Sequence, residues 1–143
     1  MWDTEGFNVV SGNIDTPFAA AYVATLKVDV LNFKGIDWLF RPTLLGDVSI
    51  TGVTALVQFS TKRAPVEATD ADWAYLPYLD VVPATGIATI RTLEQQIAVP
   101  GAAPFTLAFT NEVRGRWMRL KFKSTGGDPT NSKTTITAYR RLL

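Results

Sequence analysis

The sequence predicts an all-β fold: an antiparallel, jelly-roll-like β-sandwich of about eight strands with an extended N-terminal arm. Short stretches of alternating apolar and polar residues recur along the chain, and Gly, Pro and Asp residues separate them. No stretch shows a convincing 3.6-residue helical period. A length of 143 residues is typical of one domain, so we expect residues 1–17 to form the arm and residues 18–143 a single sandwich.

The first 17 residues are rich in Asp, Gly and Asn but include Trp2 and Phe7. Chain termini are usually loose unless they dock on something. We therefore expect Trp2 and Phe7 to anchor the arm, either on the domain's own sheet, which is favoured, or on a neighbouring subunit.

Three strands are predicted in the first half of the chain, at 18–33, 36–41 and 48–60. The first contains the longest alternating run, which places Tyr22, Ala24, Leu26, Val28 and Val30 on one face. Pro42 is expected to end the second strand, and Gly52 to mark a bend or bulge in the third. The polar stretch 61–72 is predicted to be a surface loop.

Six further strands are predicted at 73–78, 86–91, 95–99, 105–110, 116–123 and 133–140, with a possible helical turn at 91–96. In the strand at 116–123, one face is apolar and belongs to the core. The opposite face forms what we call the cationic strip, made of Trp117, Arg119, Lys121 and Lys123.

Charge is unevenly distributed along the chain. Residues 114–143 hold eight Lys or Arg and one acid, a charge of +7, whereas residues 1–113 hold six basic and twelve acidic residues, a charge of −6. Such asymmetry is typical of a surface that meets an acidic partner, including another copy of the chain. The alternative is that these cations only keep an edge strand solvated, which is favoured slightly.

The composition excludes most catalytic chemistry. The chain has no His and no Cys, which excludes Ser-His-Asp and Cys-His catalysis and zinc sites built from these residues. We expect no enzymatic activity and no cofactor. Glu67, Asp70 and Asp72 could offer oxygen ligands to calcium, but the stretch that contains them lacks the glycine and the closing glutamate of a calcium loop. We therefore predict no metal site.

Two binding functions remain possible from the residues alone. Trp73, Tyr75 and Tyr78 could form a platform for a sugar ring, with Asp70 or Asp72 holding hydroxyl groups, although the alternation favours packing of Trp73 and Tyr75 within the protein. The cationic strip could bind a single nucleic acid strand. The pI of the chain is about 8.0, whereas nucleic-acid-binding domains usually have a pI above about 9. Nucleic acid is therefore not the expected partner. No window has the roughly 18 apolar residues of a membrane span.

Four general features of the chain belong together: an acidic and aromatic N-terminal arm, strands rich in Ala, Thr and Val, the lack of Cys and His, and a sequence that stops on its last predicted strand. In these features the chain resembles small all-β virion proteins of tailed bacteriophages, particularly capsid decoration (cement) proteins. Locally, Asp72-Trp73-Ala-Tyr75-Leu-Pro77 and Gly115–Leu120 are similar to discoidin-type jelly-roll domains. The bridging cysteines of that family are absent here.

The resemblance to decoration proteins implies a non-enzymatic protein that binds and stabilises the head lattice. It would be made in the host cytoplasm and reside on the capsid surface rather than the tail. Its partners would be the major capsid protein or other virion proteins, and it would form a homo-oligomer, with a trimer favoured. We expect interface contacts from Trp2, Phe7, Arg114, Arg116, Arg119 and Lys121.

Overall fold

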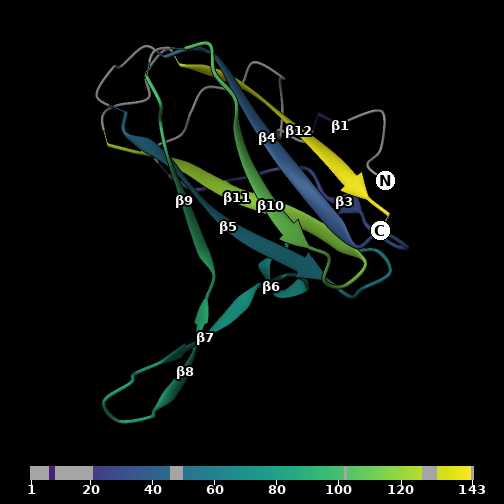
Figure 1. The fold of residues 1–143 in the computed structure, drawn as a ribbon. Coiled ribbons are helices and arrows are strands. Elements are labelled where there is room, and N and C mark those ends of the chain that lie inside the picture. Colours follow the sequence, from purple (N-terminus) through teal and green to yellow (C-terminus); the bar gives the residue numbers. More distant parts are fainter. Residues whose placement is uncertain (1–6, 9–20, 46–49, 102, 127–131, 143) are drawn as a thin grey trace.

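The computed structural model describes residues 7–8, 21–45, 50–101, 103–126 and 132–142. Two antiparallel sheets pack face to face, and a two-stranded hairpin projects from one edge (Figure 1). The predicted all-β sandwich is therefore confirmed. Apart from one 3₁₀ turn at Asp70–Asp72, the regular elements of the described residues are all strands.

The first sheet has the order β1-β12-β4-β10. Its central strands are β4 (Gly35–Leu44) and β12 (Lys133–Arg141), and β10 (Leu107–Glu112) forms one edge. At the other edge, β1 (Phe7–Asn8) pairs with β12, Phe7 opposite Ala138. These two residues of the predicted arm therefore add a strand to the protein's own sheet, as favoured by the sequence.

The second sheet is built on β11 (Trp117–Thr125) and β5 (Gly52–Ser60), which pair along their whole length. On one side of β11 lie two short strands, β2 (Val23–Ala24) and β3 (Val28–Asp29). On the far side of β5 lie β6 (Ala74–Tyr75) and β9 (Glu94–Ala98). Although β11 and β12 are consecutive, they belong to opposite sheets.

The core lies between the inward faces of the two sheets, and the period of two in each strand selects its members. Phe40 packs edge-on against both Phe109 of its own sheet and Phe122 of the other, with ring centroids 5.2 Å apart in each case. The predicted core face of β11 is confirmed. The buried apolar cluster consists of Val28, Val30, Ile36, Trp38, Phe40, Val53, Ala55, Val57, Leu107, Phe109, Met118, Leu120, Phe122, Ile136 and Ala138.

The prediction of a single strand over 18–33 is wrong for the residues described. Ala24 pairs with Lys121 and Val28 with Met118, so three residues on one strand face two on β11. At this bulge, the Thr25 hydroxyl, rather than a carbonyl, accepts the hydrogen bond from the Leu120 N–H (3.1 Å).

One extra residue reverses which face of the sheet the side chains occupy. Val28 and Val30 consequently enter the core. Leu26 and Tyr22, which the predicted alternation placed on the same face as these valines, do not: Leu26 is 40% exposed, and the Tyr22 ring lies beside Lys123 on the outer face.

Two smaller predictions are also wrong. Pro42 does not end its strand, because β4 continues to Leu44 and a register shift at Lys133/Thr134 relaxes the pairing opposite the proline. Proline is tolerated at such irregularities. The possible helical turn at 91–96 does not form, since residues 91–92 end β8 (Ala88–Thr92), residues 94–96 begin β9, and the intervening Leu93 N–H bonds to the Leu76 carbonyl. Cross-strand pairing decides the conformation there.

Candidate functional site

A β-hairpin arm leaves the sandwich at the edge of β5. Both of its legs begin in that sheet: β6 pairs with the end of β5, and β9 with its beginning. At the level of Val57 both legs leave the sheet and pair with each other instead of with β5. The Leu76 N–H still donates to the Val57 carbonyl (2.8 Å), but the Leu76 carbonyl already accepts from the Leu93 N–H (2.7 Å). Beyond this point, β7 (Pro77–Val81) pairs only with β8.

The hairpin arm, residues 77–92, projects clear of both sheets (Figure 1). The Val82 N–H donates to the Ile87 carbonyl (3.0 Å), and the Val82 carbonyl accepts from the N–H groups of Thr85 and Gly86, which closes the tip. Gly86 has a φ of +66°, a left-handed conformation that suits glycine. The arm is thus a regular, closed hairpin.

The two faces of the hairpin arm differ in chemistry. Leu79 pairs with Ile90, and Val81 with Ala88, so one face is apolar. The opposite face carries Tyr78, Asp80, Thr89 and Arg91, and the Arg91 Nε donates to Asp80 Oδ2 (2.7 Å). In sandwich strands such alternation separates a core face from a solvated face. Here none of the described strands lies behind the apolar face.

The exposure of the arm follows from this geometry. Every residue from Pro77 to Thr92 is exposed except Asp80, which is half-buried. Leu79 is 62% exposed and Ile90 is 75% exposed. Five large apolar side chains are exposed on this projecting element, and exposed apolar groups of this kind mark interaction sites. Leu79, Val81 and Ile90 lie on the apolar face, whereas Val82 and Ile87 flank the turn on the opposite side.

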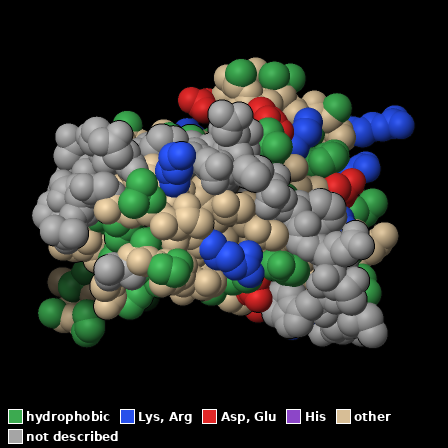
Figure 2. Space-filling view, turned by 90° about the horizontal axis from the view of Figure 1, so that it is seen from above, with side chains coloured by type: hydrophobic (Ala, Val, Ile, Leu, Met, Phe, Trp, Pro, Cys, Tyr) green, Lys and Arg blue, Asp and Glu red, His purple; other side chains and the backbone are tan. Residues whose placement is uncertain are grey.

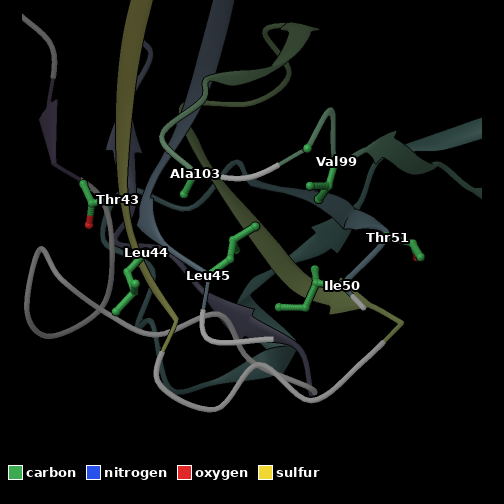
Figure 3. Close-up of a pocket in the computed structure, with 8 residues that line it drawn as sticks. Thr43, Leu44, Leu45, Ile50, Thr51, Val99 and Ala103 are labelled. Carbon is green, nitrogen blue, oxygen red and sulfur yellow. The ribbon is translucent and has the colours of Figure 1, made fainter. Parts of the chain in front are cut away.

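A second feature is an apolar recess of about 480 Å³ at the end of the sandwich where β4 finishes and β5 begins. Its described lining comes from three separate segments (Figure 3): the end of β4, the residues before β5 and the segment after β9. The lining residues are Thr43, Leu44, Leu45, Ile50, Thr51, Val99, Gly101 and Ala103. Leu44 is 48% exposed, whereas Ile50 is buried.

The predicted surface loop after β5 is tied onto the outer face of the second sheet. The indoles of Trp73 and Trp117 donate to the carbonyls of Val66 (3.1 Å) and Arg63 (3.2 Å). The Lys27 ammonium donates to the Pro65 carbonyl (2.7 Å). We call residues 61–73 the covering loop, because it lies over half of the cationic strip.

Aromatic rings and cations alternate across this outer face. Cations lie within cation–π distance of four rings: Lys27 and Arg116 at Trp117 (5.0 and 5.6 Å), Arg119 at Trp73 (4.3 Å), Lys121 at Tyr75 (5.8 Å) and Lys123 at Tyr22 (4.7 Å). Desolvation, followed by the charge of Glu94, raises the pKa of Tyr22. The strip is engaged with the protein's own aromatic rings.

Arg119 does not lie on an exposed strip, which corrects the sequence-based expectation. It is 1% exposed, its Nε donates to Gln58 Oε1 (2.8 Å) and its Nη1 donates to the Glu67 carbonyl. Desolvation lowers the pKa of its guanidinium, opposed by the nearby charges of Asp70 and Glu67. As positioned in this chain, Arg119 is a structural residue beneath the covering loop.

The other predicted interface residues are divided among several places. Arg114 is exposed, whereas Arg116 Nη2 lies 3.3 Å from Asp29 Oδ2. Lys121 Nζ is 3.6 Å from Asp70 Oδ1. The basic C-terminal segment thus meets part of the acidic segment within one chain. Trp2 and the side chain of Phe7 lie outside the described residues.

Figure 2 shows one face of the molecule. On that face the described Lys and Arg side chains are scattered among apolar and uncharged groups instead of forming one basic patch.

The sugar-platform residues are not gathered on one exposed surface. Trp73 is 7% exposed, which agrees with the favoured packing role and leaves it no open ring face for a sugar. Tyr75 (40% exposed) lies on β6, and Tyr78 (43% exposed) on the polar face of the hairpin arm. The Asp72 carboxylate accepts hydrogen bonds from Lys62 and the Val66 N–H, while Asp70 is 84% exposed.

The three acids of the covering loop face different partners. Glu67 Oε1 accepts from the Lys27 N–H (3.0 Å), and Asp70 approaches Arg119 and Lys121. Within the described residues, no cluster of three or more acidic side chains could hold a metal ion. A search of the same residues for a helix long and apolar enough to cross the membrane finds none.

The projecting arm was missed by the sequence interpretation, which assigned strands at 73–78 and 86–91 to the sandwich. Two signals could have found it. Alternation continues through Val81 and resumes at Ala88, and the intervening Pro83-Ala84-Thr85-Gly86 is a compact turn sequence. Periodicity cannot show whether such a pair lies within a sheet or beyond it.

A scan against protein-family models finds no match to this chain, and a search of curated proteins finds no similar sequence.

Proposed function

We propose that this chain is a non-enzymatic structural protein that joins a larger assembly through its hairpin arm. The assembly suggested by the sequence resemblance is the head of a tailed phage, where the chain would act as a decoration protein. The observation that carries the proposal is the exposed apolar face formed by Leu79, Val81, Ala88 and Ile90.

The energetics of the arm favour a docking role. An isolated two-stranded hairpin is at best marginally stable in water, because it has little apolar surface to bury. This arm nevertheless places Leu79, Val81 and Ile90 on a face that none of the described strands covers. A partner that covers Leu79 and Ile90 would supply the missing hydrophobic stabilisation.

The rest of the molecule provides a rigid base for such an arm. Both legs continue into strands paired with β5, and β5 is paired along its other side with β11. A scaffold protein needs this kind of fixed support and complementary contact surfaces rather than reactive groups.

The direct test removes the arm and leaves its supports. Replacing residues 77–92 with Asn-Gly would join Leu76 to Leu93, whose backbone groups already form the hydrogen bond expected next to a two-residue turn. The variant should therefore keep the sandwich, which circular dichroism and a single cooperative unfolding transition would verify.

Wild-type and arm-less proteins would each be co-expressed with the phage head proteins, and the particles sedimented through a gradient. We expect the wild-type chain to travel with the particles and the arm-less chain to remain at the top. Leu31→Asp, at a site that is 51% exposed outside the arm, serves as the control and should still bind. A wild-type chain absent from the particles would overturn the virion role. Equal binding of the arm-less chain would overturn the role of the arm.

A further inference from the structure

We infer that the hairpin arm of one copy inserts its apolar face and tip into the recess of a second copy, so that the chains join head to tail. This inference rests on the proposed docking role of the arm and names its first partner. The donor surface consists of Leu79, Val81 and Ile90 on the apolar face and of Val82 and Ile87 at the tip, and Leu44 lies on the rim of the acceptor.

The two surfaces match in chemistry. The lining of the recess has no charged side chain among its described members, and the large side chains are aliphatic. The apolar face of the arm is likewise uncharged, since the ion pair of Asp80 with Arg91 lies on the opposite face. Val82 and Ile87 also lie on that opposite side, but at the end nearest the turn. Among the residues that the structure describes, docking through these surfaces would bury no unpaired charge, which is the arrangement that a stable interface requires.

Their positions on the fold require two molecules. The arm leaves the sheet opposite Val57 and projects away from the sandwich (Figure 1), whereas the recess lies beyond the start of β5, at Ile50 and Thr51. The legs that hold the arm are paired with β5 up to this departure point. The arm therefore cannot fold back into its own recess without breaking those pairs.

The available area is sufficient for a specific contact. The five donor side chains are between 45% and 75% exposed. The apolar face and the tip together present on the order of 500 Å² of apolar surface, an area similar to that of the largest apolar patches on monomers. A matching area on the acceptor gives roughly 1,000 Å² in total, which is about the lower limit for a biological interface.

A contact between two different surfaces is heterologous, and repetition of it produces either a closed ring or an open filament. Closure after three copies would produce the trimer that the sequence resemblance suggests. An alternative geometry, in which two arms pair symmetrically through their apolar faces, would produce only a dimer.

Cross-linking distinguishes these arrangements, because the chain contains no native Cys. Ile90→Cys and Leu44→Cys would be prepared as separate full-length proteins and treated with a short bismaleimide, alone and as a mixture. Head-to-tail docking predicts a cross-linked pair only in the mixture. A product from Ile90→Cys alone would indicate arm-to-arm pairing and overturn the inference.

Light scattering of the unmodified protein across a concentration series provides the second measurement. We expect a mass that rises above 15.7 kDa and that falls back to the monomer in the Leu79→Thr/Ile90→Thr variant, whose residues retain good strand propensity. The control, Leu31→Asp, should associate like wild type. A protein that stays monomeric and uncross-linked, yet still binds particles through its arm, would overturn this inference and leave the proposed function intact.

Discussion

The guanidinium carbon of Arg119 lies 4.3 Å from the centroid of the Trp73 ring, and both side chains are buried on the outer side of the second sheet. Arg119 also bonds to Gln58 on β5 and to the carbonyl of Glu67 in the covering loop. One cation thus joins a strand, a loop and an aromatic ring. Its desolvation is offset by these directed contacts, because a buried charge without partners would be very costly.

We predict that Arg119→Ala lowers the free energy of unfolding by on the order of 3 kcal/mol, because it leaves buried acceptors unpaired and empties the space beneath Trp73. Arg119→Lys should recover only part of this loss, since an ammonium cannot reproduce the planar fork. Denaturant unfolding measures both values. Arg91→Ala removes an exposed ion pair with Asp80 and should cost less than about 1 kcal/mol; an equal cost for the two alanine variants would contradict the structural role of Arg119.

The covering loop should respond to acid through Asp72. Hydrogen bonds from Lys62 and from the Val66 N–H lower the pKa of this carboxyl below its ordinary value of 3.8. A carboxyl whose pKa is lower in the folded state stabilises that state above its ordinary pKa, and the contribution is lost as pH falls through the folded-state pKa.

Tryptophan fluorescence, which reports Trp73 at the end of the covering loop, should therefore change at pH values below about 3.8. Other carboxyl groups titrate in the same range, so the comparison is with Asp72→Asn. The variant should show a weaker loop attachment at neutral pH and should lack the part of the acid transition that belongs to Asp72. Identical acid profiles for the two proteins would rule out this role.

Gly115 and Gly86 provide a matched pair of backbone tests. Both have positive φ, +64° and +66° respectively. A Cβ at Gly115 would lie 2.7 Å from the Ser60 carbonyl oxygen, whereas a Cβ at Gly86 would meet no atom within 4 Å. Gly86→Ala should cost about 1–2 kcal/mol for the left-handed conformation alone.

Gly115→Ala adds a steric clash with backbone, so its cost in thermal or denaturant unfolding should exceed that of Gly86→Ala. The same Ser60 carbonyl accepts a hydrogen bond from the Arg116 N–H (2.9 Å), which limits how far it can move aside. Equal destabilisation by the two substitutions would show that the turn before β11 adapts more freely than this geometry implies.

Alternation predicted faces well wherever a strand is regular. Met118, Leu120 and Phe122 are buried as their spacing indicates, because successive side chains of a strand point to opposite sides. The prediction failed at Thr25, where a bulge reverses the faces of the strand. The apolar residues keep alternating through this bulge, so the hydrophobic pattern does not reveal the extra residue. Alternation also identified the outward side of β11 correctly, but it gave no indication that the covering loop lies over part of this side.

By itself, the sequence determined the sandwich class, the inward face of β11 and the lack of histidine and cysteine chemistry, since these depend on local periodicity and composition. Tertiary structure alone decided that residues 61–73 cover Arg119, that β7 and β8 leave the sheet together and that the end of β4 meets the start of β5 at a recess. The reason is physical: these features arise from contacts between segments distant in the chain, such as Gln58 with Arg119, and local alternation carries no information about which strand or loop will lie against a given face.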